Sequence, residues 1–115
     1  MENNHLISWS DFEKIDLRVG TIIEVLDFPE AKKPAYQLHI DFGAEIGVLK
    51  SSAQITKRYS KESLVNRQIV AVVNFPKKQI GKFMSECLVL GAVEGVGDVV
   101  LLNPDFSVEN GTRIA

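Results

Sequence analysis

The chain has 115 residues, of which 45% are hydrophobic and 24% are charged, and this predicts one soluble globular domain over residues 1–115. Its single cysteine, Cys87, excludes an internal disulfide framework, and no segment approaches the ~20 apolar residues that a membrane-spanning helix requires. Since residues 1–5 also lack the basic and then apolar order of a secretory signal, we expect a cytoplasmic protein without membrane insertion.

The first predicted element is a short helix near residues 8–15. Ser10 and Glu13 have the spacing of a capping box, in which two side chains each satisfy a free backbone donor at the start of a helix. Trp9 and Phe12 would place apolar groups on one side of this helix.

Alternating apolar residues predict two strands in the first half of the chain. Residues 17–25 alternate with their odd-numbered side chains facing inward, and Gly20 indicates a bulge or a sharp bend within them. Residues 36–42 alternate as well, and residues 46–51 are expected to form their hairpin partner. A long, bent first strand is typical of an OB-fold.

The second half of the chain predicts further strands with little helix. Residues 53–66 are expected to be helical or turn-like, with Ser60 as a cap, and residues 75–84 are expected to form a basic loop. Apolar runs predict three more strands, at residues 69–73, 87–90 and 99–102. This pattern favours an all-β barrel or sandwich over alternating strand–helix units.

Charge is distributed unevenly along the chain. The net charge is −5 over residues 1–49, +7 over residues 50–82 and −4 over residues 83–115. A basic middle between acidic ends predicts one face suited to a polyanion, and scattering of the same lysines around a solvated surface is the alternative.

Catalytic and cofactor-binding patterns are absent from the sequence. It contains neither GxxxxGK(S/T) nor GxGxxG, and its two histidines and single cysteine lack the spacing of zinc ligands. Cys87 begins an apolar run, which favours a buried and inert thiol, and His39 falls on the polar face of its strand, which favours a solvated side chain. We therefore expect no enzyme, no catalytic residue, no cofactor and no metal site.

Several motifs resemble the tRNA-binding domain family. In the family's order they are residues 16–22 as the opening strand, Pro29–Ala31 as Pro-x-Ala, Asp41–Gly43 as Asp-x-Gly, residues 67–75 as a buried strand with its asparagine turn, and residues 81–85 as Gly-x-x-Ser with one extra residue. The resemblance covers residues 10–114. It implies a five-stranded OB-fold barrel over about residues 16–102, with a short N-terminal helix and an irregular C-terminal extension.

Within that family, seven blocks look like the CsaA group of export-related chaperones. They are residues 28–31, 40–47, 51–56, 72–76, 85–91, 97–102 and 110–114. Members appended to synthetases usually carry Ser-Gly where this chain has Ser51-Ser52, and Gly-Met where it has Glu86-Cys87. Both departures fall near the expected nucleic-acid face and bear on the affinity for tRNA.

The resemblance implies two binding functions, one for tRNA and one for unfolded or pre-secretory polypeptides. An accessory module acting with an aminoacyl-tRNA synthetase is the alternative. Phosphate contacts are expected from one connected face of basic residues: Lys32, Lys33, Lys50, Lys57, Arg58, Lys77, Lys78 and Lys82.

Aromatic side chains are the candidates for apolar contacts. A stacking surface for bases is expected from Phe75 or Phe83, with core packing as the alternative. A peptide groove needs exposed apolar surface, and its candidates, for which packing in a core or a dimer is the alternative, are Trp9, Phe28, Phe75 and Phe106.

A homodimer is expected, because free members of the family are dimers and because apolar residues lie outside the five strands. These residues, which could instead fold back on their own barrel, are Leu6, Ile7, Trp9, Phe12, Val108 and Ile114.

Overall fold

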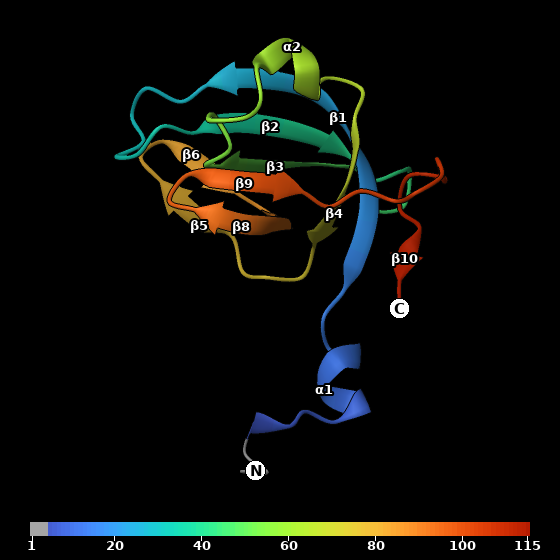
Figure 1. The fold of residues 1–115 in the computed structure, drawn as a ribbon. Coiled ribbons are helices and arrows are strands. Elements are labelled where there is room, and N and C mark those ends of the chain that lie inside the picture. Colours follow the sequence, from blue (N-terminus) through green and yellow to red (C-terminus); the bar gives the residue numbers. More distant parts are fainter. Residues whose placement is uncertain (1–4) are drawn as a thin grey trace.

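Five antiparallel strands wrap into a nearly closed barrel in the computed structural model, which describes residues 5–115 (Figure 1). Their order across the sheet is β3 (Val48–Ala53), β2 (Tyr36–Asp41), β1 (Leu17–Asp27), β4 (Gln68–Val72) and β7 (Leu88–Val89). The two edges of the sheet approach each other where the Glu86 N–H donates to the Lys50 carbonyl at 2.7 Å. The predicted all-β, five-stranded OB-fold barrel is therefore confirmed. Residues 1–4, which belong to the segment searched for a signal, lie outside the described residues.

Strand β1 is bent, and its inward face changes along its length. Leu17 and Val19 are buried as predicted, but Ile22 is then fully buried whereas Ile23 is 46% exposed. The register against β2 shifts between Ile22 and Glu24, which marks a bulge. The prediction that all odd-numbered residues face inward is therefore wrong at Ile22 and Ile23, and the bulge then returns the inward position to an odd-numbered residue, the buried Val25.

Gly20 lies where β1 passes closest to the barrel interior. A Cβ atom at this position would lie 2.7 Å from both Ile40 Cγ2 and the Phe42 ring. The bulge lies between Ile22 and Glu24, two to four residues after Gly20. Gly20 itself leaves room for the buried side chains of Ile40 and Phe42.

Strand β1 contributes to two apolar clusters, with Leu17 and Val19 in one and Ile22 and Val25 in the other. The barrel core contains Ile22, Leu38, Ile40 and Phe42, each at most 1% exposed. A second cluster unites Leu17, Val19, Val70 and Val72, with Phe12 and Ile114 packed against it. The second cluster joins the chain ends to the barrel.

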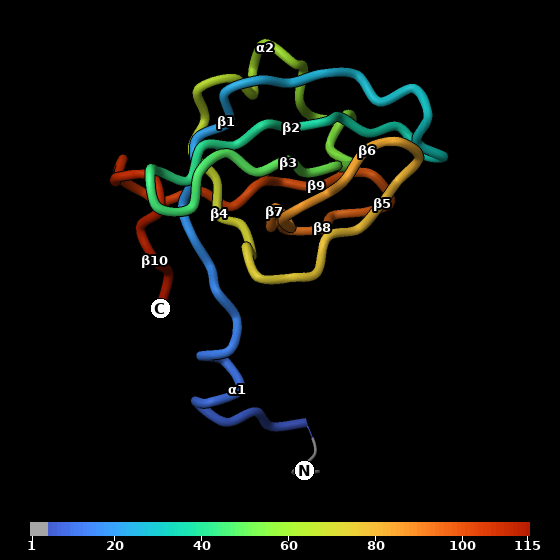
Figure 2. The backbone as a smooth tube through the Cα atoms, turned by 180° about the vertical axis from the view of Figure 1, so that it is seen from behind, coloured from blue at the N-terminus to red at the C-terminus, as the bar shows by residue number. Residues whose placement is uncertain are grey.

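The N-terminal helix α1 (Trp9–Glu13) projects from the barrel on an arm, as Figures 1 and 2 both show. Its cap is Ser8, whose Oγ accepts from the Asp11 N–H while the Asp11 carboxylate accepts from the Ser8 N–H. The predicted capping box of Ser10 and Glu13 is therefore wrong. The helix begins at Trp9 because Ser8 is extended, with φ −91° and ψ 165°.

Helix α2 (Lys61–Leu64) follows β3 and covers one end of the barrel (Figure 1). Ser60 is its N-cap, as predicted, and its side chain accepts from the Ser63 N–H. Leu64 is fully buried in the barrel core, so a single turn of helix is enough to close that end.

Two hairpins extend the barrel. Residues expected to form a basic loop contain β5 (Lys78–Ile80) and β6 (Phe83–Ser85), which pair antiparallel, so the loop prediction is wrong for them. The second hairpin pairs β8 (Gly91–Gly95), which was not predicted, with β9 (Asp98–Leu101).

The C-terminal extension is anchored rather than wholly irregular. Its last strand, β10 (Arg113–Ile114), pairs with the start of β1. Gly111, with φ +92°, passes so close to the barrel that a Cβ atom there would lie 2.5 Å from the Phe42 carbonyl oxygen. The extension therefore leaves both chain ends on the side of the second apolar cluster.

Candidate binding surfaces

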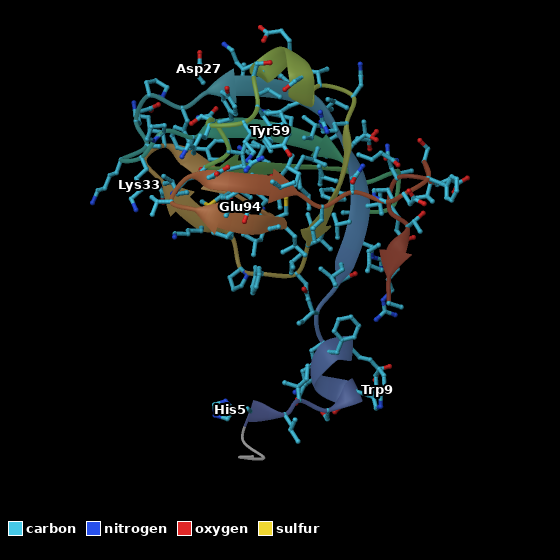
Figure 3. The ribbon with its side chains drawn as sticks, viewed as in Figure 1. His5, Trp9, Asp27, Lys33, Tyr59 and Glu94 are labelled. Atoms are coloured by element: carbon cyan, nitrogen blue, oxygen red, sulfur yellow. The ribbon has the colours of Figure 1, made fainter. Side chains whose placement is uncertain are left out.

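One end of the barrel gathers lysines from separate segments. Lys32 and Lys33 lie in the loop between β1 and β2, and Lys33 is labelled at this end in Figure 3. A Cβ atom on Gly81, in the turn of the β5–β6 hairpin, would lie 3.7 Å from Glu30 Cβ in the same loop. The turn that precedes Lys82 therefore lies against the loop that carries Lys32 and Lys33.

An aromatic pair holds this loop and the hairpin together. The ring centroids of Phe28 and Phe83 are 5.2 Å apart, and both side chains are buried with Ala35. The Lys50 ammonium lies 5.3 Å from the Phe83 ring centroid. Since both rings are covered, the prediction that Phe28 lines an exposed groove is wrong, and Phe83 follows the core-packing alternative rather than stacking on bases.

Lys57 joins the lysines at this end from the segment after β3. It lines a depression of about 370 Å³ together with Lys33 and with Val96 in the β8–β9 turn. Among residues 5–115, six of the predicted basic residues have no ion pair: Lys32, Lys33, Lys50, Lys57, Lys78 and Lys82.

Arg58 is engaged by a carboxylate from the β8–β9 hairpin. Its guanidinium hydrogen-bonds to both oxygens of Asp98, and this bond raises the pKa of Arg58 and lowers the pKa of Asp98. A phosphate at Arg58 would compete with Asp98 for the guanidinium, so this residue is less available than the predicted lysines that form no ion pair.

The remaining predicted lysines, Lys77 and Lys78, lie at the base of the β5–β6 hairpin. Lys77 forms an ion pair with Glu86, with its Nζ 3.4 Å from Oε2. Lys78 lines a neighbouring groove of about 590 Å³, whose apolar surface comes from Phe75 and Leu88. Phe75 is 53% exposed and Leu88 is 47% exposed.

The N-terminal arm exposes the largest aromatic side chain of the protein. Trp9 is 87% exposed and lies remote from the barrel in Figure 3. With Ile7, Phe12 and Ala115 it lines a depression of about 660 Å³. Phe106, in the C-terminal extension, is 79% exposed. Three of the four candidates for a peptide groove, Trp9, Phe75 and Phe106, are therefore open to solvent.

Cys87 and His39 have the environments that their positions in the sequence predict. The Cys87 side chain is buried, as predicted, and burial raises the pKa of its thiol to about 12, which disfavours the reactive thiolate. His39 is partly exposed, with its Nδ1 3.7 Å from Glu24 Oε1. Within residues 5–115, no group of three or more His, Cys, Asp or Glu is placed to hold a metal ion, and no helix is long and apolar enough to cross a membrane.

Residues 85–87 form a contact that the sequence did not predict. Glu86 Oε1 accepts from the Lys50 N–H at 3.0 Å, and Ser85 Oγ accepts from the Ser52 N–H at 3.2 Å. The sequence held one indication of this contact. Residues 51–52 and 86–87 both depart from the pattern of synthetase-appended members, and the fold brings these two segments together.

Comparison with known proteins supports the same fold over nearly the whole chain. The family model for the tRNA binding domain matches residues 17–113. The crystal structure of the chaperone CsaA from Bacillus anthracis str. Ames is 54% identical, covers 96% of this chain and 99% of that chain, and superposes with a TM-score of 0.91. The CsaA chaperone protein from Picrophilus torridus is 58% identical, covers 96% of this chain and 100% of that chain, and superposes with a TM-score of 0.90.

More distant similarity connects the chain to part of a much longer enzyme. Methionine–tRNA ligase of Thermococcus onnurineus strain NA1 is 40% identical over 108 residues, which is 94% of this chain. The chain spans only 14% of the length of that relative. The family match and the two similar structures together establish that the chain belongs to the tRNA-binding domain family and is a homologue of the CsaA chaperones.

Proposed function

We propose that this chain acts as a cytoplasmic chaperone that holds unfolded or export-bound polypeptides, binds tRNA, and has no catalytic activity. The observation that carries the proposal is the similarity to two CsaA chaperones at 54% and 58% identity, over 96% of this chain. The methionine–tRNA ligase similarity covers only 14% of that enzyme.

Exposed apolar surface beside the β5–β6 hairpin supports polypeptide binding. Phe75 and Leu88 line a groove of about 590 Å³ and are each about half exposed. An extended apolar segment placed there would remove both side chains from water, which stabilises a complex roughly in proportion to the apolar area buried.

Replacing Phe75 by glutamate is expected to raise severalfold the concentration of protein needed to suppress aggregation of an unfolded polypeptide, because the change places a charge in the apolar groove. Light scattering of a reduced, aggregating polypeptide measures this. Val96→Glu is the matched control, since Val96 is 87% exposed in the β8–β9 turn and does not line this groove. Equal loss in both variants would argue against the groove. Suppression that disappears as salt is raised would argue against apolar capture.

Lysines from three segments support tRNA binding. Lys32 and Lys33 lie in the β1–β2 loop, Lys82 follows the turn of the β5–β6 hairpin that lies against this loop, and Lys77 and Lys78 lie at the base of that hairpin. Phosphate contacts from such a set would make the affinity depend steeply on salt.

The pair of variants Lys78→Glu and Lys61→Glu tests this face with equal changes of charge. Lys61 lies in α2 and pairs with Asp27, so we expect only Lys78→Glu to weaken tRNA binding strongly, by about tenfold at low salt. The double variant K77E/K78E should weaken it further. Filter binding of bulk tRNA across a salt series measures both effects, and equal affinity of K78E and wild type at low salt would remove Lys78 from the site.

A homodimer built from the N-terminal arm and the C-terminal extension is the third part of the proposal. Leu6, Ile7 and Trp9 are 64%, 71% and 87% exposed on an arm that projects from the barrel. In a two-fold dimer this surface would meet its own copy, and each fully buried side chain of this size would contribute about 1.5–3 kcal/mol before association costs.

A further inference from the structure

The carboxylate of Glu86 is held in place against the basic face. Its Oε1 accepts from the Lys50 N–H at 3.0 Å, and the Glu86 N–H donates to the Lys50 carbonyl at 2.7 Å. Two hydrogen bonds to one residue of β3 fix both the backbone and the side chain of Glu86. The side chain is only 17% exposed, so its charge is poorly screened by water.

The second oxygen of Glu86 forms an ion pair with Lys77, a residue predicted to bind phosphate. Lys77 Nζ lies 3.4 Å from Glu86 Oε2 and is itself 65% exposed. A tRNA phosphate that approached Lys77 would meet a fixed negative charge and would compete with it for the ammonium group. Since the carboxylate is already ordered by its bonds to Lys50, it loses little freedom by holding Lys77.

We propose that Glu86 is a residue that determines ligand selectivity, by restraining the affinity of this face for tRNA and other polyanions. The proposal rests on the proposed function insofar as Lys77 belongs to the nucleic-acid face. Glu86 acts on Lys77 through the negative charge of its carboxylate, with Oε2 as the nearer oxygen, whereas Oε1 accepts from the Lys50 N–H at the barrel seam. The two roles use different oxygens and can therefore be separated.

The variant Glu86→Gln separates them, because a glutamine oxygen can still accept from the Lys50 N–H while the charge is removed. We expect E86Q to bind bulk tRNA at least about fivefold more tightly at low salt, because removal of one unit charge near 4 Å has about this effect even with full screening by water. The slope of log K against log salt should become steeper by about 0.9, because Lys77 is freed for one phosphate. Thermal unfolding of E86Q should stay close to wild type.

Two further variants test whether the effect is local. Glu62→Gln removes one negative charge from an exposed position in α2 and should leave tRNA affinity nearly unchanged. In the double variant E86Q/K77A, most of the gain should vanish because the freed lysine is missing.

The outcomes distinguish this inference from the proposed function. If wild type fails to bind tRNA but E86Q binds, tRNA binding by the natural protein is wrong and the role of Glu86 stands. The role of Glu86 is overturned if E86Q binds no better than E62Q, if the gain persists in E86Q/K77A, or if neither wild type nor E86Q binds.

Discussion

The variant Phe42→Ala is expected to lower the free energy of unfolding by about 3–5 kcal/mol, a large part of the stability of a domain of this size. Phe42 is 1% exposed in the barrel core, and its N–H donates to the Gly47 carbonyl at 2.9 Å. Gly20 lies against the ring and has no side chain that could fill the space left behind. The cavity should therefore collapse only partly, which places the loss toward the upper end of the range.

Urea denaturation followed by circular dichroism measures this loss. Phe75→Ala is the matched control, because it removes the same ring from a side chain that is 53% exposed, and it should cost about 1 kcal/mol or less. Similar losses for the two variants would contradict the assignment of Phe42 to the core.

The second large effect is expected at the N-terminal arm. Sedimentation equilibrium of wild type at micromolar concentration should give a mass near twice 12.8 kDa, and Trp9→Glu should raise the dissociation constant of the dimer by about 30-fold or more. The reason is that Trp9, 87% exposed in this chain, would be buried against a second copy. A glutamate in the first turn of α1 is compatible with the helix, because its negative charge lies near the positive end of the helix dipole.

Val96→Glu serves as the control for added charge. Val96 is also 87% exposed, but it lies in the β8–β9 turn, on the barrel rather than on the arm. Its mass should match that of wild type. A wild-type mass near 12.8 kDa at all concentrations would remove the dimer, and with it any site shared between two subunits.

The alternation of apolar residues determined much of the barrel from the sequence alone. The strands β2 and β4 lie within two residues of their predicted bounds, because period-two alternation and doubly apolar runs are local signals. The Ser60 cap of α2 was likewise readable, since its partner, the Ser63 N–H, is three residues away. The family resemblance then selected the OB-fold from the barrels and sandwiches that the pattern allowed.

The tertiary structure alone decided which face each residue presents. The bulge between Ile22 and Glu24 is visible only against the register of β2, and it exchanges the two faces of β1, so that Ile22 is buried before it and Val25 after it. Phe28 is buried because Phe83, 55 positions further along the chain, packs on it at 5.2 Å. Neither contact has a local signal in the sequence. The sequence therefore could not show that Phe28 is buried whereas Phe106 is exposed.

The candidate binding face follows the same division between sequence and structure. The sequence determined that residues 50–82 are basic, because net charge depends on composition alone. Which of these charges is free depends on carboxylates outside that segment: Asp98 holds Arg58, and Glu86 holds Lys77. Such pairs form only when the hairpins fold onto the barrel, since a salt bridge needs its two groups within about 4 Å whatever their separation along the chain.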